Sequence, residues 1–254
     1  MSNLFNEKPT DYTIEILKHW EKFALDKHED GYYGAFSGGK DSCVIKRCAE
    51  MAGIKVKWYY HAAIDPPELY NFILKEHPDV NVTKLKTPFI DLICKNGLPT
   101  RRQKWCCRLI KEHGGDGRFI LTGVRAQESS KRSKRKFMEY WRKDGTRKWV
   151  VNPVLHWSEQ DVWDFIKKEN IPYCKLYDEG WRRLGCIGCP ENTNRHKQFK
   201  RWPKTEKMWK KGLQKLWDRG PNFVKKFDNV DDVWDWWLSN GSSEKQETSE
   251  CTIF

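Results

Sequence analysis

Residues 35–42, Ala35-Phe36-Ser37-Gly38-Gly39-Lys40-Asp41-Ser42, decide the fold of this 254-residue chain. An apolar run over residues 32–36 predicts a short buried strand, and residues 41–52 carry apolar side chains at helical spacing. A strand, a glycine-rich turn and a helix together form a phosphate-binding geometry. The glycines let backbone N–H groups approach an anion at the positive end of the helix dipole. The lysine adds a mobile charge, and the two serines add hydroxyl donors.

A two-glycine turn between a strand and a helix is by itself an ordinary connection. Here six consecutive residues, Ser37 to Ser42, have the types that a phosphate site needs. The stretch differs from the Walker A pattern, which places four residues between its glycines and ends in Lys-Ser/Thr. It resembles the PP-loop of the adenine-nucleotide alpha-hydrolase superfamily. That resemblance implies that the loop holds the pyrophosphate part of ATP, with cleavage between the α and β phosphates.

Strands and helices alternate on both sides of this stretch, which predicts an α/β fold with a parallel twisted sheet and helices on both faces. Further strands are expected over residues 54–63, 80–85, 118–124 and 149–154. Helices are expected over residues 11–25, 68–77, 88–94, 101–113 and 159–170. Ligands bind such sheets at the C-terminal ends of the strands, where the loop would meet Asp65 and Gly123-Val124-Arg125.

Composition narrows the class of protein. Hydrophobic residues make up 38% and charged residues 32%, with no apolar run long enough to span a membrane. The first residues lack the basic start and apolar stretch of a signal peptide, so we expect a cytoplasmic protein with no membrane partner. The net charge of +12 favours a polyanionic partner or substrate, although a solvated basic surface would give the same value.

Residues 126–148 are polar and basic, with five positive charges among the six residues 131–136. A run of charge is usually a solvated loop. Because this run follows the expected ligand edge, a lid that closes over an anion is the alternative.

The nine cysteines raise a question of chemistry, since structural disulfides are rare in the cytosol. Cys106-Cys107 and the Cys186-Ile187-Gly188-Cys189 loop supply four thiols, which suit a tetrahedral zinc or an iron–sulfur cluster. Adjacent cysteines are awkward for one zinc and easier on a 4Fe-4S cube. A redox-active CxxC beside two buried thiols is the competing interpretation.

The other cysteines differ in their surroundings. Four lie among apolar residues and are expected in the core: Cys43, Cys48, Cys94 and Cys174. Cys251 follows Glu250 near the end of a polar tail, where a thiol can be incidental or can reach an active site.

Over residues 30–192 the chain resembles the phosphoadenosine phosphosulfate (PAPS) reductase family. The matching blocks are Ser37 to Ser42, Trp105-Cys106-Cys107, Thr122-Gly123-Val124-Arg125 with Glu128-Ser129 and Arg132, and a long block from Asn152 to Cys186 that includes Leu176-Tyr177-Asp178. The resemblance implies a bound adenine nucleotide, with Arg125 and Arg132 in contact with its phosphate or sulfate. Asp65 and Gly123, at the ligand edge of the expected sheet, are the further nucleotide-binding candidates beside the loop. The resemblance also favours the 4Fe-4S cluster on Cys106, Cys107, Cys186 and Cys189, as in the iron–sulfur members.

The family divides by chemistry. Its sulfonucleotide reductases attack the sulfate sulfur with a cysteine in a C-terminal Glu-Cys-Gly-Leu/Ile-His, and their PP-loop is typically degenerate. Here Glu250-Cys251-Thr252-Ile253-Phe254 keeps only part of that tail motif, whereas the PP-loop is complete. A complete loop fits ATP with Mg²⁺, and members of that type adenylate an acceptor before a sulfur donor displaces AMP.

The C-terminal part adds a hint about partners. Residues 196–220 interleave basic side chains with Trp202, Trp209 and Trp217, a pattern that suits DNA or RNA but also a helix packed through its tryptophans. We favour packing for most of the rings and a nucleic-acid role for some of the charge. The expected division is therefore a nucleotide-binding domain (1–195), a basic helical segment (196–238) and a flexible tail (239–254).

These patterns predict an ATP pyrophosphatase and sulfurtransferase of nucleic-acid thiolation type, with Lys40 and Arg125 as catalytic residues. The alternative is a thioredoxin-dependent reductase of PAPS or adenosine phosphosulfate (APS) that uses Cys251. A nucleic-acid-binding regulator without turnover is the third hypothesis. A sulfur donor protein or thioredoxin would be the protein partner, and we expect a homo-oligomer.

Overall fold

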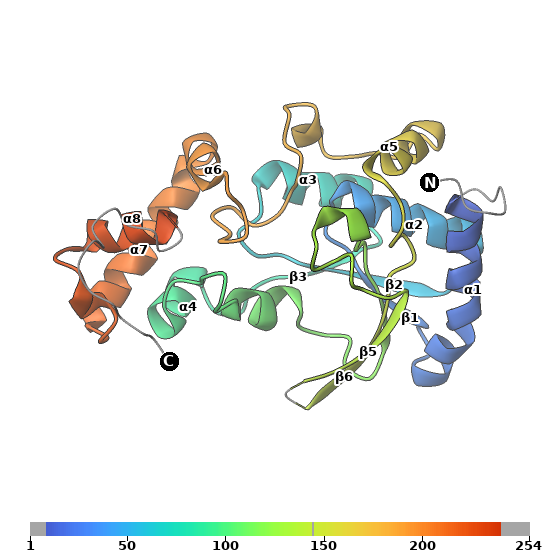
Figure 1. The fold of residues 1–254 in the computed structure, drawn as a ribbon, viewed down its shortest axis with the longest axis horizontal. Helices are drawn as coiled ribbons and strands as arrows, with labels where there is room; N and C mark the ends of the chain where they lie inside the picture. The colour runs from blue at the N-terminus through green and yellow to red at the C-terminus, as the bar shows by residue number, and fades with distance from the viewer. Residues whose placement is uncertain (1–8, 144, 240–254) are drawn as a thin grey trace. The chain divides into compact units, whose positions relative to one another are not determined.

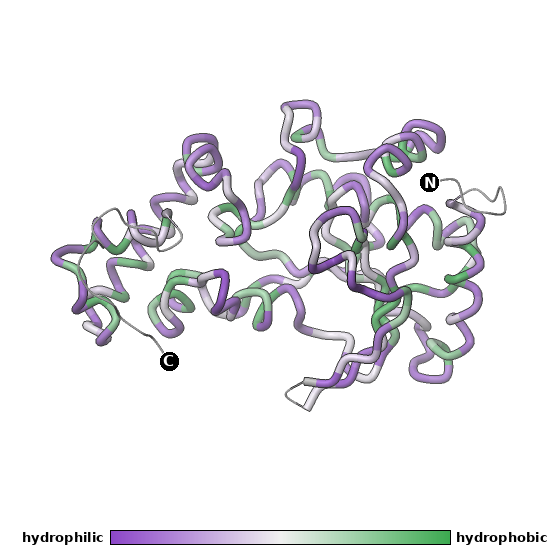
Figure 2. Tube along the Cα trace, in the orientation of Figure 1, coloured by the Kyte–Doolittle hydropathy of each residue, from purple (hydrophilic) through white to green (hydrophobic). Residues whose placement is uncertain are grey.

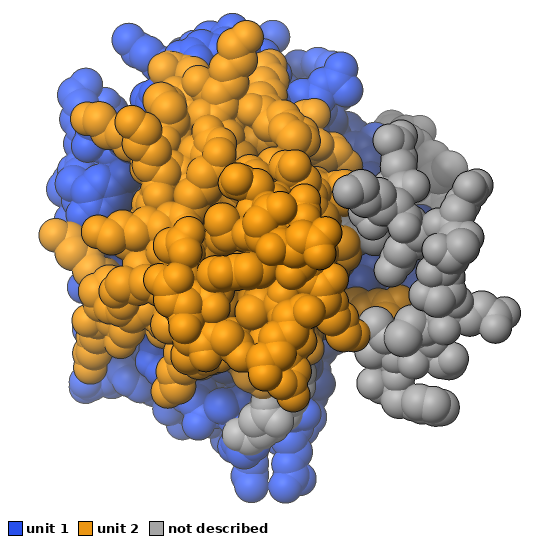
Figure 3. All heavy atoms as spheres, turned by 90° about the vertical axis from the view of Figure 1, so that its left-hand side faces the viewer, with its two compact units in different colours: residues 1–62, 67–83, 113–185 blue, residues 63–66, 84–112, 186–254 orange. Residues whose placement is uncertain are grey.

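The computed structural model describes residues 9–143 and 145–239. The chain forms two compact units, which Figure 3 shows in different colours. Unit 1 comprises residues 1–62, 67–83 and 113–185, and unit 2 comprises residues 63–66, 84–112 and 186–254. Each unit joins segments that are distant in sequence, whereas the division expected from the sequence followed chain order.

Unit 1 contains one six-stranded sheet in the order β3-β2-β1-β4-β6-β5 (Figure 1). Its strands are β1 (Tyr32–Ala35), β2 (Val56–His61), β3 (Asn81–Thr83), β4 (Phe119–Leu121), β5 (Met138–Lys143) and β6 (Thr146–Val151). All neighbours pair in parallel except β5, which runs antiparallel to β6. The predicted α/β class with a mainly parallel sheet is therefore confirmed.

Helices alternate with the first strands, as the pattern predicted: α2 (Lys40–Ala52) connects β1 to β2, and α3 (Pro67–Glu76) connects β2 to β3. Unit 1 also contains α1 (Pro9–Lys27) before β1 and α5 (Glu159–Lys168) after β6, with the 3-10 turns η2 (Ala126–Glu128) and η3 (Lys175–Tyr177). Ser158 caps α5 as expected, because its hydroxyl accepts from the Asp161 N–H while the Asp161 carboxylate accepts from the Ser158 N–H. The central strands are buried, and Figure 2 shows hydrophobic residues gathered there.

The basic stretch after β4 differs from the sequence-based expectation. The solvated loop or lid was expected for the charged run 131–136, and no strand was expected over residues 137–148, yet β5 and the start of β6 form an antiparallel hairpin at the sheet edge. The charged residues in this stretch hid the hairpin, because they interrupt the alternation of apolar and polar residues that indicates a strand. The remaining run, residues 131–136, is a turn that leads into β5.

Unit 2 is helical. It contains α4 (Phe89–Asn96), the π-helical turn η1 (Cys107–Lys111), α6 (Arg195–Arg201), α7 (Pro203–Arg219), the 3-10 turn η4 (Val224–Lys226) and α8 (Val230–Leu238). The helix predicted over residues 101–113 is thus much shorter than expected. Helix α4 packs against α7, and a Cβ atom on Gly212 would lie 2.7 Å from Ile93 Cδ1, so glycine permits this close approach.

Tryptophans form the core of unit 2. Trp202, Trp209, Trp234 and Trp237 are all buried, and the rings of Trp209 and Trp237 lie 4.7 Å apart. This confirms that most tryptophans of the basic segment pack inward, because large aromatic rings contribute most of the burial in a small core. Among the helices of the described residues, none combines the length and the apolar character that crossing a membrane requires.

Candidate functional site

The PP-loop lies where the sequence placed it, between the end of β1 and the start of α2. Gly38 has a φ of +71°, and a Cβ atom there would lie 2.6 Å from Ile73 Cδ1, so the turn requires glycine on both counts. The Ser42 hydroxyl donates to the Gly39 carbonyl oxygen at 2.8 Å and lies 3.2 Å from the Ser37 hydroxyl oxygen. These contacts hold the loop around the N-terminus of α2, where an anion is favoured.

Lys40 and Arg125 lie in one network of charges beside this loop. The Lys40 side chain is 5% exposed, and its Nζ lies 3.3 Å from Glu159 Oε1 and 3.6 Å from Asp41 Oδ2. Arg125, equally buried, donates from Nε to Asp41 Oδ1 at 2.5 Å and from Nη2 to Glu159 Oε2 at 2.7 Å. Two cations and two carboxylates thus converge at the start of α2.

The electrostatics of this network favour the charged forms of Arg125 and Glu159. Burial disfavours the charge of Arg125, but Asp41 and Glu159 outweigh burial and raise its pKa. Burial likewise favours the neutral form of Glu159, but Lys40 and Arg125 outweigh it and lower its pKa. Two buried cations beside a half-exposed carboxylate suit an anionic ligand, because phosphate oxygens can replace the carboxylates as partners of the cations.

Two further predicted nucleotide residues lie near the network. A Cβ atom on Gly123 would lie 3.2 Å from Asp41 Cβ, so Gly123 packs directly on the first turn of α2. The Arg132 guanidinium bonds to the Glu128 carboxylate, which also accepts the Arg125 N–H at 3.0 Å. The structure therefore connects Gly123, Arg125 and Arg132 with the loop inside unit 1.

Asp65 lies in unit 2, outside the unit that holds the loop. Its carboxylate accepts from Lys111 Nζ at 2.7 Å and from the Ala63 N–H at 3.1 Å. Burial disfavours the charge of Lys111, but Cys186 and Asp65 outweigh burial and raise its pKa. Asp65 is thus the ion-pair partner of a lysine beside the cysteines.

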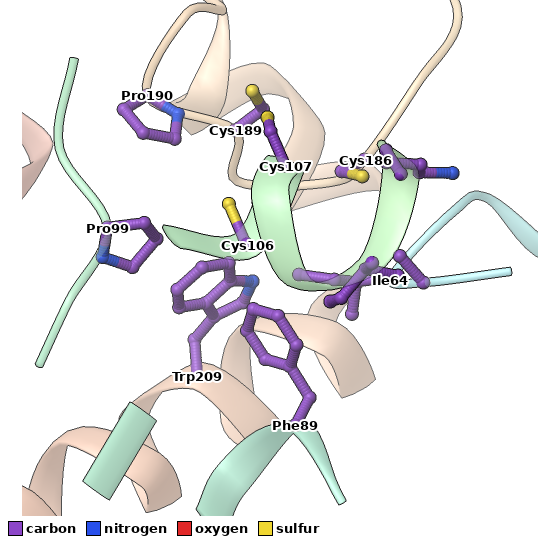
Figure 4. Close-up of a pocket in the computed structure, with 12 residues that line it drawn as sticks. Ile64, Phe89, Pro99, Cys106, Cys107, Cys186, Cys189, Pro190 and Trp209 are labelled. Carbon is purple, nitrogen blue, oxygen red and sulfur yellow. The ribbon is translucent and has the colours of Figure 1, made fainter. Parts of the chain in front are cut away.

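The four predicted ligand cysteines line one cavity of unit 2 (Figure 4). Cys106 and Cys107 begin η1, and Cys186 and Cys189 come from the loop before α6. The rest of the lining is apolar except for Lys111, and it includes Phe89, Ile110 and Trp209. The structure thus brings together two cysteine pairs that are about eighty positions apart in the sequence.

Backbone contacts hold the Cys186–Cys189 loop in place. The Ile187 N–H donates to the Ile64 carbonyl at 2.8 Å, and Trp209 Nε1 donates to the Ile187 carbonyl at 3.1 Å. Gly188 has a φ of +79°, and a Cβ atom there would lie 2.8 Å from Trp209 Nε1. Only glycine satisfies both conditions, so the CxxC turn depends on the packing of α7.

The thiols of the cavity are perturbed in different directions. Burial raises the pKa of Cys186 to about 12. The hydrogen bond between the adjacent cysteines lowers the pKa of Cys107 and raises that of Cys106. Within residues 9–143 and 145–239, no three His, Cys, Asp or Glu side chains are arranged to hold a single metal ion.

The remaining cysteines follow the expectation with one exception. Cys43, Cys48 and Cys174 are buried, as predicted. Cys94 was also predicted in the core, but it is only half-buried, and its thiol donates to the Lys215 carbonyl at 3.6 Å. Cys251, a predicted catalytic residue of the alternative function, lies outside the described residues.

Three residues of these sites were missed by the sequence analysis. Glu159 bridges Lys40 and Arg125, and Tyr177 accepts the Lys40 backbone N–H at 3.0 Å. Lys111 lines the cysteine cavity. Tyr177 belongs to one of the sequence blocks that resemble the family, and Glu159 directly follows the helix cap Ser158. The sequence therefore marked both positions, but it did not indicate that either residue contacts Lys40.

The fold and the loop define a nucleotide-binding α/β protein of PP-loop type. The phosphoadenosine phosphosulfate reductase domain family matches the sequence over residues 32–192. The chain therefore belongs to this family.

Known relatives agree with the assignment. An uncharacterised protein of Methanocaldococcus jannaschii is 30% identical over 201 residues, which are 74% of this chain and 48% of that protein. An adenosine 5′-phosphosulfate reductase of Oceanobacillus iheyensis is 37% identical over 90 residues, which are 34% of this chain and 36% of the relative. The chain thus spans less than half the length of these relatives.

A solved structure supports the fold. The phosphoadenylyl-sulfate reductase of Candida auris superposes with a TM-score of 0.50 at 20% identity, covering 72% of this chain and 90% of that one. At this identity the likeness concerns the fold alone.

Proposed function

We propose that the chain binds ATP at its PP-loop, cleaves it between the α and β phosphates and adenylates an acceptor for sulfur transfer. The observation that carries this proposal is the complete Ser37–Ser42 loop, built between β1 and α2 with Lys40 buried beside it. A substrate with a pyrophosphate leaving group needs such a loop, since the departing charge must be stabilised.

Each group of the network has a role in this proposal. Lys40 and the N–H groups at the start of α2 would bind the pyrophosphate and stabilise it as it leaves. Arg125 would contact a second phosphate oxygen, and Asp41 and Glu159 hold both cations in position until the nucleotide arrives. Mg²⁺ bound with ATP would offset the remaining phosphate charge.

We further propose that Cys106, Cys107, Cys186 and Cys189 hold a 4Fe-4S cluster. The donor set fits, because four thiols line one cavity and cluster irons take one thiolate each. Such a cluster supplies redox and sulfur-binding chemistry. The chain's own contribution is to hold the thiols on an apolar wall with Lys111 beside them.

A second candidate function is the thioredoxin-dependent reduction of PAPS or APS with release of sulfite. Relatives named adenosine 5′-phosphosulfate reductase favour it, although they match about a third of this chain. It would require Cys251 as the attacking thiol, whereas the first proposal does not.

Product analysis on anaerobically purified protein separates the two. One sample receives ATP and Mg²⁺, and the other receives PAPS or APS with reduced thioredoxin. We expect AMP and pyrophosphate from the first sample, at an unchanged rate in Cys251→Ser. Sulfite from the second sample, abolished in Cys251→Ser, would overturn the first proposal in favour of the reductase.

A further inference from the structure

Unit 1 carries a row of aromatic rings that reaches from α1 to the sheet edge. The row, called here the aromatic strip, consists of Trp20, Phe23, Phe119, Trp149 and Tyr140. Phe119 is buried in the middle and stacks on Trp149 at 5.3 Å with an interplanar angle of 8°. Its ends are open, since Tyr140 is 52% and Phe23 is 37% exposed.

Cations border the strip. Lys22 Nζ lies 5.0 Å from the Phe23 ring centre, and Lys27 Nζ lies 5.3 Å from that of Trp149. Replacing these cation–π contacts by contacts with a phosphate costs little free energy, because the ammonium groups remain near water.

Two arginines extend the strip along the hairpin. Arg142 pairs with Arg147 across β5 and β6, and Tyr140 pairs with Trp149 two positions earlier. Since strand side chains alternate, these four share one face of the hairpin. The two paired arginines repel each other, because like charges at directly opposite positions are destabilising. Among the described residues, neither guanidinium has a carboxylate within ion-pair distance. The nearest acidic contact is to the Arg147 backbone N–H, which donates to Asp116 Oδ1 at 2.6 Å.

We propose that the aromatic strip and the Arg142–Arg147 pair bind a single strand of nucleic acid. Exposed rings stack on unpaired bases, and the flanking cations neutralise the backbone phosphates. A duplex hides the faces of its bases and fits this surface less well. The proposal deepens the proposed function, because it names how a nucleic-acid acceptor would be held.

This surface is distinct from the basic helix α7. The tryptophans of that helix are buried or half-buried, so its lysines stand without exposed rings. The hairpin instead combines an exposed aromatic ring with cations, the two features that single-strand binding requires. Figure 1 labels the two strands of the hairpin, and Figure 2 shows hydrophilic residues along them in purple.

Fluorescence anisotropy with a labelled strand of about 16 nucleotides tests the proposal, with full-length protein and no ATP. We expect Tyr140→Ala to weaken binding by at least about fivefold, while Tyr140→Phe retains it. Arg142→Gln and Arg147→Gln should each lower the slope of log affinity against log salt by about 0.7. Tyr12→Ala is the matched control, since Tyr12 is an exposed aromatic residue outside the strip.

Three outcomes would overturn the proposal. The first is that Tyr140→Ala binds the strand with the same affinity as the natural protein, when circular dichroism shows that both proteins are folded. The second is loss of binding only in a Lys204→Ala, Lys207→Ala, Lys211→Ala variant, which would assign the contact to α7. The third is self-association through β5 without nucleic-acid binding in sedimentation. Lys40→Ala should bind the strand normally, so failure of ATP cleavage and failure of strand binding are separate results.

Discussion

The PP-loop takes six consecutive residues between β1 and α2, whereas the cysteine cavity draws its lining from residues 63–64, 89–111 and 186–209. The loop owes its shape to glycine backbone angles and to the start of one helix. The cavity owes its shape to the packing of α7 under the CxxC turn. A local motif is therefore enough for the first site, while the second exists only once unit 2 has folded.

Loss of the cluster is the largest effect that this comparison predicts. In Cys186→Ser the thiolate is lost from a buried position, and we expect the bound iron to fall from about four atoms per chain to near none. Iron and acid-labile sulfide analysis of anaerobic protein measures it. Cys94→Ser is the control, because Cys94 lies in unit 2 outside the cavity lining. Equal iron in both variants would contradict the assigned ligands.

Removing the lysine of the loop should affect only the other site. In Lys40→Ala the leaving pyrophosphate loses a buried cation, so AMP formation should fall by about a hundredfold or more while the iron content stays unchanged. Lys75→Ala removes a lysine of α3 that is 83% exposed and should have no effect on the rate. A tenth or more of the normal rate in Lys40→Ala would remove this lysine from the catalytic role.

A smaller effect concerns acid stability of unit 1. His77 packs behind the loop, 3.7 Å from Cys43 Sγ, and burial, then Lys46, lowers its pKa from 6.5 to about 4. His77 therefore stays neutral when folded but protonates when unfolded between these pH values. Its contribution to stability is complete above pH 6.5 and is lost as the pH falls to about 4, at up to about 1.4 kcal/mol per pH unit.

Hydrogen exchange at α2 and α3 between pH 7 and pH 4, corrected for intrinsic rates, measures this loss. In His77→Phe the ring contacts with Phe36 and Phe72 can persist without a titrating group, so the dependence on pH should flatten in this range. The same dependence in both proteins would assign the acid sensitivity to other groups.

Local patterns predicted much of unit 1. The capped start of α5, the strand before the phosphate loop and the loop itself all follow from a few neighbouring residues. The hairpin strand β5 escaped prediction because Glu139, Arg142 and Lys143 interrupt the apolar alternation that indicates a half-buried strand. The π-helical turn at Cys107 escaped because apolar spacing does not distinguish a single turn from a longer helix.

The family, the α/β class and the PP-loop could be inferred from the sequence, since each depends on contiguous residues whose chemistry is local. That Arg125 and Glu159 join Lys40 and Asp41 in one network became visible in the folded chain. Folding also places the two cysteine pairs around one cavity and buries Trp209 of α7 while leaving Tyr140 exposed. These features depend on which distant side chains meet, and packing across long stretches of chain selects those contacts.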